Sequence, residues 1–190
     1  LMIGSRTFKQ VHLSDIDVNT MTAHPQFRQH FTKLVRTMQI GDRLGYRDIC
    51  TFTFAWPGEY TTGSPKSTGS PTWPMRWITR GGIISRNEMD KLEKAFSLMI
   101  EEAERYDGNL VLMQMPWNYT NTTGNFRRIV EEVGSRRLKV MWGPSDNYNS
   151  GEWDVATAGF QNVRPYLHGL PLQDLRVNNG LKLDFTYLSL

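Results

Sequence analysis

The chain has 190 residues, of which 39% are hydrophobic and 22% are charged, a composition typical of a soluble globular protein with a single domain over residues 1–190. Its formal net charge is +3, and its Lys and Arg residues are scattered, which argues against nucleic acid as a partner. No apolar run is long enough to span a membrane, and the single cysteine, Cys50, excludes an intrachain disulfide and suits a reducing compartment. We therefore expect a cytoplasmic protein that binds neither nucleic acid nor membranes.

The first half of the chain contains two predicted helices with a predicted strand between them. Apolar residues at helical spacing predict a helix over residues 25–44, and a short run of β-branched and aromatic residues predicts a strand over residues 48–55. Ser85 and Glu88 have the spacing of a capping box, in which each side chain accepts a hydrogen bond from the other's backbone N–H. This pair predicts the start of a second helix, which Gly108 ends.

Strands and helices continue to alternate in the second half. The pattern predicts a strand over residues 109–115, a helix over 126–134, a strand over 138–142, a helix over about 153–163 and a further strand within 164–177. The run at 109–115 is almost entirely apolar, which is typical of a strand buried on both faces of a parallel sheet. The alternation predicts an α/β fold of right-handed βαβ units, with a parallel sheet that is either open or closed into a barrel.

A long insertion over residues 56–77 separates the first predicted strand from the second helix. It repeats Gly-Ser-Pro and contains Trp56, Trp73 and Trp77. Loops of this length are uncommon inside a compact domain and often carry function. Two interpretations remain open: a surface insertion without a role in binding, or a lid whose tryptophan side chains cover a ligand.

Polar residues follow the predicted strands at the points where each strand ends. They are Gln114 and Asn118, then Asp146 and Asn147, then Asp174 and Arg176. Parallel strands bring their carboxyl ends to one edge of the sheet, and that edge carries the active site in α/β barrels and in open α/β sheets. The sequence therefore predicts a functional site built from these residues.

Four stretches resemble the xylose-isomerase-like TIM barrels, the family of sugar (phosphate) isomerases and epimerases. LGYRDICTFTFA resembles the fourth strand of the family, NLVLMQMPWNYTNT with FRRIVEEVGSRRLKVMWGPSDNYNSGE resembles the fifth and sixth, and VRPYLHGLPLQDLRV resembles the seventh. The resemblance implies a parallel (β/α) barrel of the TIM type, with this chain covering roughly strands three to seven. Such a partial barrel has two unpaired edges, so either the chain is part of something longer or a second subunit, identical or different, completes it.

The resemblance also implies a chemistry. The family moves a proton next to a sugar carbonyl with the help of one Mn²⁺ or Mg²⁺ ion, because a hard cation held by carboxylates polarises the carbonyl oxygen while a carboxylate carries the proton. In this chain the family's ligand positions fall on Gln114 (or Met113 in a shifted register), Gly143 and Pro171. Gln offers one neutral oxygen, and Gly and Pro offer no side-chain ligand.

Three interpretations follow. The chain is a carbohydrate isomerase or epimerase, or it is a non-catalytic relative that has lost its metal and binds a sugar or serves as a partner subunit, or the residues at 114, 143 and 171 are not the native ones. We expect the catalytic groups to be Gln114, Asp146 and Asp174, and the substrate-binding groups to be Trp56, Asn118, Asn147, His168 and Arg176.

Each of these residues also has a purely structural interpretation. Asp174 and Arg176 could form a surface ion pair of little energetic weight. Asp146 and Asn147 are residue types that favour turns. His168 lies in an apolar segment, where a lone His more often forms a hydrogen bond in the core than binds a ligand.

Overall fold

The computed structural model describes residues 1–57, 82–171, 174–178 and 182–186, and for the last two ranges it describes the backbone. Its main feature is a five-stranded sheet in which all neighbours are parallel and the strand order follows the chain: β1 (Met2–Gly4), β2 (Asp48–Phe52), β3 (Asn109–Met113), β4 (Leu138–Met141) and β5 (Leu167–Gly169). Sequential pairing of this kind is the order of a barrel rather than of a doubly wound sheet. The predicted α/β fold with a parallel barrel-type sheet of five strands is confirmed.

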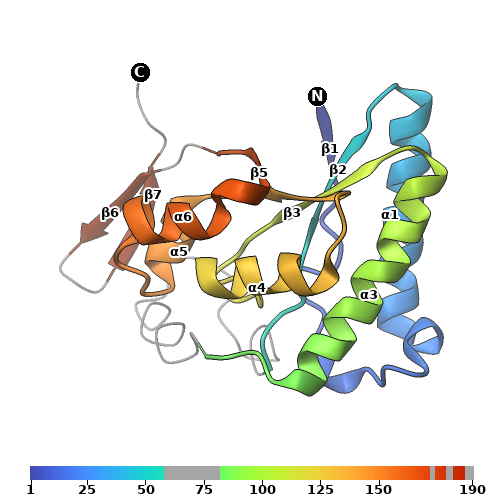
Figure 1. The fold of residues 1–190 in the computed structure, drawn as a ribbon, viewed down its shortest axis with the longest axis horizontal. Coiled ribbons are helices and arrows are strands. Elements are labelled where there is room, and N and C mark those ends of the chain that lie inside the picture. Colours follow the sequence, from blue (N-terminus) through green and yellow to red (C-terminus); the bar gives the residue numbers. More distant parts are fainter. Residues whose placement is uncertain (58–81, 172–173, 179–181, 187–190) are drawn as a thin grey trace.

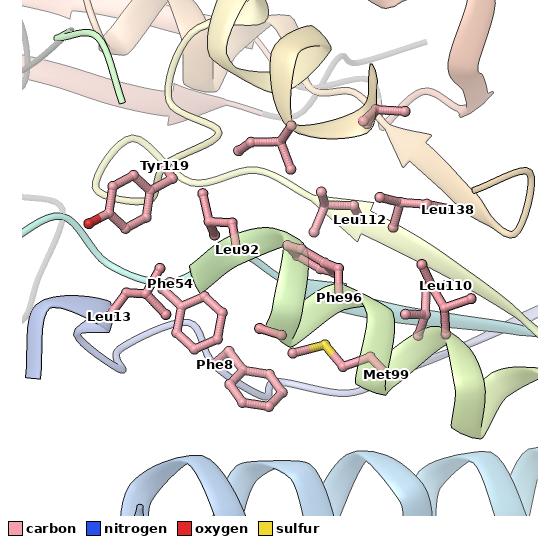
Figure 2. Packing of buried hydrophobic residues seen from close by; sticks show 14 of the residues in the cluster. Phe8, Leu13, Phe54, Leu92, Phe96, Met99, Leu110, Leu112, Tyr119 and Leu138 are labelled. Atoms are coloured by element: carbon pink, nitrogen blue, oxygen red, sulfur yellow. The ribbon is translucent and has the colours of Figure 1, made fainter. Parts of the chain in front are cut away.

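Helices cover one face of this sheet (Figure 1). They are α1 (Pro25–Arg43), α3 (Arg86–Arg105), α4 (Thr123–Val133) and the short α6 (Phe160–Val163). Their buried side chains form one continuous core with every second residue of β2, β3 and β4, and Figure 2 shows Phe96 and Met99 of α3 against Leu110 and Leu112 of β3. Burial of this apolar layer is the main favourable contribution to folding.

The opposite face of the sheet is also partly enclosed. Cys50, Phe52 and Val111 are buried but do not belong to the helix-facing core, as expected for residues that alternate with it along each strand. The His168 Nε2 atom of β5 lies 2.9 Å from Asp48 Oδ2 of β2. These two strands are not neighbours, so the sheet curls toward itself on this face, as a barrel does.

Local signals in the sequence place the helix ends correctly. Ser85 is the N-cap of α3, its hydroxyl accepts from the backbone N–H of Glu88, and the Glu88 carboxylate accepts from the backbone N–H of Ser85. Gly134 ends α4 in the left-handed conformation at φ 64°, which glycine adopts without steric cost.

Two segments between β4 and β5 differ from the sequence-based expectation. Residues 144–149, interpreted as a turn, form the short helix α5 (Pro144–Asn149), with Pro144 at its first position, where a missing N–H costs nothing. The helix expected over 153–163 is instead a π-helical turn, η3 (Val155–Gly159), followed by α6. Neither segment has the long apolar periodicity that makes a helix recognisable from sequence.

The strand expected within residues 164–177 is divided. It consists of a 3₁₀ turn, η4 (Arg164–Tyr166), then β5, and then a separate strand, β6 (Asp174–Asn178), which pairs antiparallel with β7 (Lys182–Thr186) in a sheet of two strands. Pro171 lies two positions beyond the end of β5, outside the ladder, which explains how a proline is tolerated there.

Most of the predicted loop insertion, residues 58–81 with Trp73 and Trp77, lies outside the described residues, so the lid remains a prediction. Within the part of the chain that the structure describes, no helix is long and apolar enough to cross a membrane.

The capping box gives a stability prediction. We expect Ser85→Ala to lower the free energy of unfolding by about 1 kcal/mol, because the first turn of α3 loses the acceptor for a backbone N–H. Ser97→Ala is the matched control, since Ser97 is exposed on the same helix and alanine is the better helix former there. Urea denaturation of both variants and the wild type measures the difference, and an equal effect of the two substitutions would contradict the role of the cap.

Candidate functional site

Three residues at the implied metal-ligand positions lie together at the carboxyl ends of the strands. Gln114 directly follows β3, and Gly143 and Pro171 each lie two positions beyond the end of β4 and of β5. The Gln114 Nε2 atom donates a hydrogen bond to the carbonyl oxygen of Gly143. A Cβ atom on Gly143 would lie 3.4 Å from Pro171 Cγ. The parallel register therefore brings these three positions to one point, which we call the strand-end site.

Asn147 of α5 connects this point to the core. Its Oδ1 atom accepts hydrogen bonds from Gln114 Nε2 at 2.9 Å and from Trp142 Nε1 at 2.7 Å, and its Nδ2 atom donates to the carbonyl oxygen of Asn121 at 2.8 Å. The Asn147 side chain is fully buried. A buried amide whose oxygen and nitrogen both have partners fixes the position of its neighbours. Losing any one of these hydrogen bonds would leave a buried polar group with neither a protein partner nor a water molecule.

Asp146 supplies a carboxylate next to this amide network. It lies in the first turn of α5, and its Oδ2 atom is 3.5 Å from the Cβ position of Gly143. Burial raises the pKa of Asp146 from 3.8 to about 7, and the positive charge of Lys9 opposes this shift. A carboxyl group with a pKa near neutrality can both give and accept a proton at physiological pH.

Lys9 belongs to the site and was not among the predicted residues. Its Nζ atom lies 5.2 Å from the centre of the Phe52 ring and 5.0 Å from that of Trp117, both within cation–π range. Its carbonyl oxygen accepts hydrogen bonds from Trp117 Nε1 at 3.1 Å and Asn118 Nδ2 at 3.0 Å. Lys9 follows β1 in a segment without a motif, so its proximity to residues more than a hundred positions away left no signal in the sequence.

Several buried polar atoms near the strand ends have no hydrogen-bond partner among the described residues: Gln114 Oε1, Asn118 Oδ1, Asn121 Nδ2 and Ser145 Oγ. Buried polar atoms are almost always satisfied in folded proteins, so a group of four such atoms calls for water or a ligand. Hydroxyl groups, which donate and accept, match this mixture of amide oxygen, amide nitrogen and hydroxyl.

The residues present do not fit the divalent cation implied by the resemblance. The described part of the chain contains no group of three or more His, Cys, Asp or Glu side chains placed to hold a metal ion. At the strand-end site, Gln114 directs its nitrogen at Gly143 and has one neutral oxygen left, and Asp146 contributes the carboxylate. Mn²⁺ and Mg²⁺ need a fuller shell of oxygen ligands than these two groups provide.

One predicted substrate-binding residue, His168, lies at the other end of the sheet. His168 bonds to Asp48 at the amino-terminal end of β2, the opposite end from Gln114, and Asn109 Nδ2 donates to the same carboxylate at 2.9 Å. Burial alone would raise the pKa of Asp48, but the hydrogen bonds from Asn109 and His168 outweigh it and hold that pKa below its usual value.

Trp56, by contrast, follows β2 at the carboxyl ends of the strands, where its backbone N–H donates to the carbonyl oxygen of Trp117 at 2.9 Å. Its side chain is buried with the ring centre 4.3 Å from that of Tyr119, and its Nε1 atom has no hydrogen-bond partner among the described residues.

The backbone of Asp174 and Arg176 lies on β6, in the two-stranded sheet, while their side chains are outside the described part of the chain. Their predicted roles in catalysis and binding remain predictions, as do those of Trp56 and His168. The structure brings together Gln114, Asp146 and Asn147. Asn118 bonds to the carbonyl oxygen of Lys9, whose ammonium group is attracted electrostatically by Asp146.

Comparison with known proteins gives no match by sequence. No protein-family model matches the chain, and no curated protein sequence matches it significantly.

Solved structures do match. The probable 3-DHS dehydratase AsbF of Bacillus anthracis is 15% identical with a TM-score of 0.60, over 93% of this chain and 51% of that one. A D-psicose 3-epimerase solved in the presence of D-fructose is 16% identical with a TM-score of 0.59, over 90% of this chain and 51% of that one. A xylose isomerase-like TIM barrel protein of Mycobacterium smegmatis, in complex with magnesium, is 10% identical with a TM-score of 0.60, over 95% and 56%.

The chain thus spans little more than half the length of each of these three proteins. Similarity at this level of identity establishes the fold and leaves the activity to be argued from the site.

The amide network gives a prediction about stability. We expect Asn147→Ala to lower the free energy of unfolding by about 2–4 kcal/mol, because the buried N–H groups of Gln114 and Trp142 lose their shared acceptor. Asn87→Ala is the control, since Asn87 is exposed in the first turn of α3. Thermal and urea unfolding measure both variants, and a cost for Asn147→Ala no larger than that of the control would show that the network does not hold the strand ends.

Proposed function

We propose that this chain, which has the fold of the xylose isomerase-like TIM barrels, binds a small carbohydrate at the strand-end site without the metal centre expected for that family. The observation that carries the proposal is the junction of Gln114, Gly143 and Pro171. The three implied ligand positions meet there, and they hold an amide, a glycine and a proline. The chain is then a sugar-binding relative of the isomerases rather than a metal-dependent enzyme.

The chemistry of the site supports a carbohydrate as the ligand. Unpartnered amide and hydroxyl atoms of Gln114, Asn118 and Ser145 can exchange hydrogen bonds with sugar hydroxyl groups. The indole N–H groups of Trp117 and Trp142 are bound to the Lys9 carbonyl and to Asn147, so both buried rings help to hold the backbone and the amide around these atoms. The D-fructose present with the D-psicose 3-epimerase, a protein of the same fold, suggests a ketose as the first probe.

A second function is favoured by Asp146. A carboxyl group whose pKa is about 7 could remove and return the proton on the carbon next to a sugar carbonyl, as an isomerase or epimerase requires. In this candidate function Gln114 and Asn118 orient the substrate, and Asp146 moves the proton.

The two edges of the parallel sheet indicate where a further segment of chain or a second subunit could pair. Among the described strands, β1 and β5 are each paired on one side only. Unpaired edges of a parallel sheet are normally covered, which supports the proposal that further chain or a second subunit, the same or different, pairs there.

Sugar binding and its dependence on metal are measured together by titration calorimetry. We expect D-fructose to bind with the same affinity in the presence of EDTA and of Mn²⁺, because the strand-end site lacks the ligands for the cation. Asn118→Ala should weaken binding about 10-fold by removing an unpartnered oxygen, while the control Asn87→Ala leaves it unchanged. A requirement for Mn²⁺, or about one ion retained per chain in elemental analysis, would contradict the metal-free site.

The proton-transfer candidate is tested by the exchange of sugar C–H for deuterium, followed by NMR in D₂O. If Asp146 is the base, exchange should increase with pH and level off above about 7, because the carboxylate is the reactive form. Asp146→Asn should abolish the exchange. Absence of exchange in the wild type, with sugar still bound, would leave the non-catalytic function.

The stability of the same variant checks the pKa independently. Because the folded pKa lies above the unfolded one, the folded chain binds the proton more strongly, and Asp146 lowers stability as the pH rises from 3.8 to 7. We expect the difference in free energy of unfolding between Asp146→Asn and the wild type to grow by about 2 kcal/mol in favour of the variant from pH 4 to pH 8. This is about half of what the full pKa shift would give, because part of the Asp146 surface stays accessible to water. A pH-independent difference would show that Asp146 titrates normally.

A further inference from the structure

The backbone around Lys9 is held in an unusual conformation. Phe8, the preceding residue, has φ 64°, in the left-handed region that a non-glycine residue with a bulky side chain rarely adopts. Its ring is fully buried, with ring centres 5.4 Å from Phe27 and 5.0 Å from Phe54, and its N–H donates to His30 Nδ1 at 2.9 Å. Strained residues of this kind persist where the surrounding packing holds them, and they cluster at functional sites.

This conformation fixes the position of Lys9. The Phe8 ring anchors the chain on the helix side of the sheet, and the Lys9 carbonyl is bound by Trp117 and Asn118 on the other side. The ammonium group is then placed over the rings of Phe52 and Trp117 at the strand ends. A lysine with a role only in solubility needs no such placement.

Lys9 has no ion-pair partner within 4.0 Å among the described residues, although Asp146 attracts it electrostatically. Arg6 likewise forms no ion pair with any residue in the part of the chain that the structure describes. Burial lowers the pKa of Lys9, the nearby positive charge of Arg6 lowers it further, and Asp146 partly opposes both. One carboxylate, Asp146, thus faces two cationic side chains, which leaves room for a further negative group beside Lys9 and Arg6.

We propose that Lys9 and Arg6 form an anion-binding subsite at the strand-end site, which takes the carboxylate or phosphate group of a charged small carbohydrate. The inference rests on the proposed function, because it adds a charged group to the sugar that binds there. The ammonium group of Lys9 acts as a fixed point charge close to the rings, and the exposed guanidinium of Arg6 reaches the anion from solvent with its paired donors.

Titration calorimetry with three probes tests the subsite on the full chain: D-fructose as the neutral sugar, D-gluconate as the carboxylate and inorganic phosphate as the phosphate source. We expect at least one of the two anions to bind more tightly than D-fructose. Comparing the titrations with D-gluconate and phosphate then shows whether the subsite binds a carboxylate or a phosphate group. Lys9→Gln should weaken anion binding about 10- to 100-fold, as expected for the loss of a charge-assisted hydrogen bond, and should weaken D-fructose binding much less.

Two further variants keep the result interpretable. Lys94→Gln removes an exposed lysine of α3 and should change neither affinity. Arg6→Gln alters an exposed side chain, so it preserves the fold even if Lys9→Gln does not, and it should weaken anion binding several-fold. Circular dichroism and thermal unfolding confirm that each variant is folded.

Failures of the two proposals are distinguishable. D-fructose binding with no preference for either anion overturns the anion subsite and leaves the proposed function standing. Equal weakening of all probes by Lys9→Gln, with the variant folded, also overturns the subsite, because Lys9 would then support the site rather than bind the anion. If none of the probes binds to the wild type, both proposals are overturned.

Discussion

The parallel register of the sheet is the constraint on which the rest of the structure depends. Parallel neighbours cannot be joined by a tight turn, so each connection must travel back along the sheet, and α1, α3 and α4 do so on one face. Burial of their apolar sides against β2, β3 and β4 fixes the register of the strands. Because all five strands point the same way, their carboxyl ends and the segments that follow them meet at one edge.

At that edge, a network of neutral amides holds the strand ends together. Asn147 of α5 joins Gln114 after β3, Trp142 after β4 and the Asn121 carbonyl through its own amide group. Fixed positive charge comes from Lys9, held by two aromatic rings and by the strained backbone at Phe8. Carbohydrate binding, proton transfer by Asp146 and anion recognition by Lys9 would use neighbouring parts of one surface.

Much of the fold could be predicted because its signals are local. The helix at 25–44, the capping box at Ser85 and the glycine stop at Gly134 depend on periodicity and on single backbone positions, which neighbouring residues specify. The helix α5 was missed, because six residues are too few to show a period and its stability comes from the contacts of Asn147. The sequence predicted one strand within 164–177, whereas the structure has two, β5 and β6, in different sheets. The division could not be predicted because the pairing partner of a strand is set by the tertiary structure.

The sequence by itself determined the α/β class, the order of the strands and, through the resemblance, the three positions that meet at the strand-end site. These follow from residue type and spacing, which are properties of the chain. Only the tertiary structure decided that Lys9 reaches Trp117, that His168 bonds to Asp48 at the far end of the sheet, and that Asp146 is buried enough to keep its proton near neutral pH. These features depend on distances across the curled sheet and on the loss of water around a side chain, and neither is encoded by nearby residues.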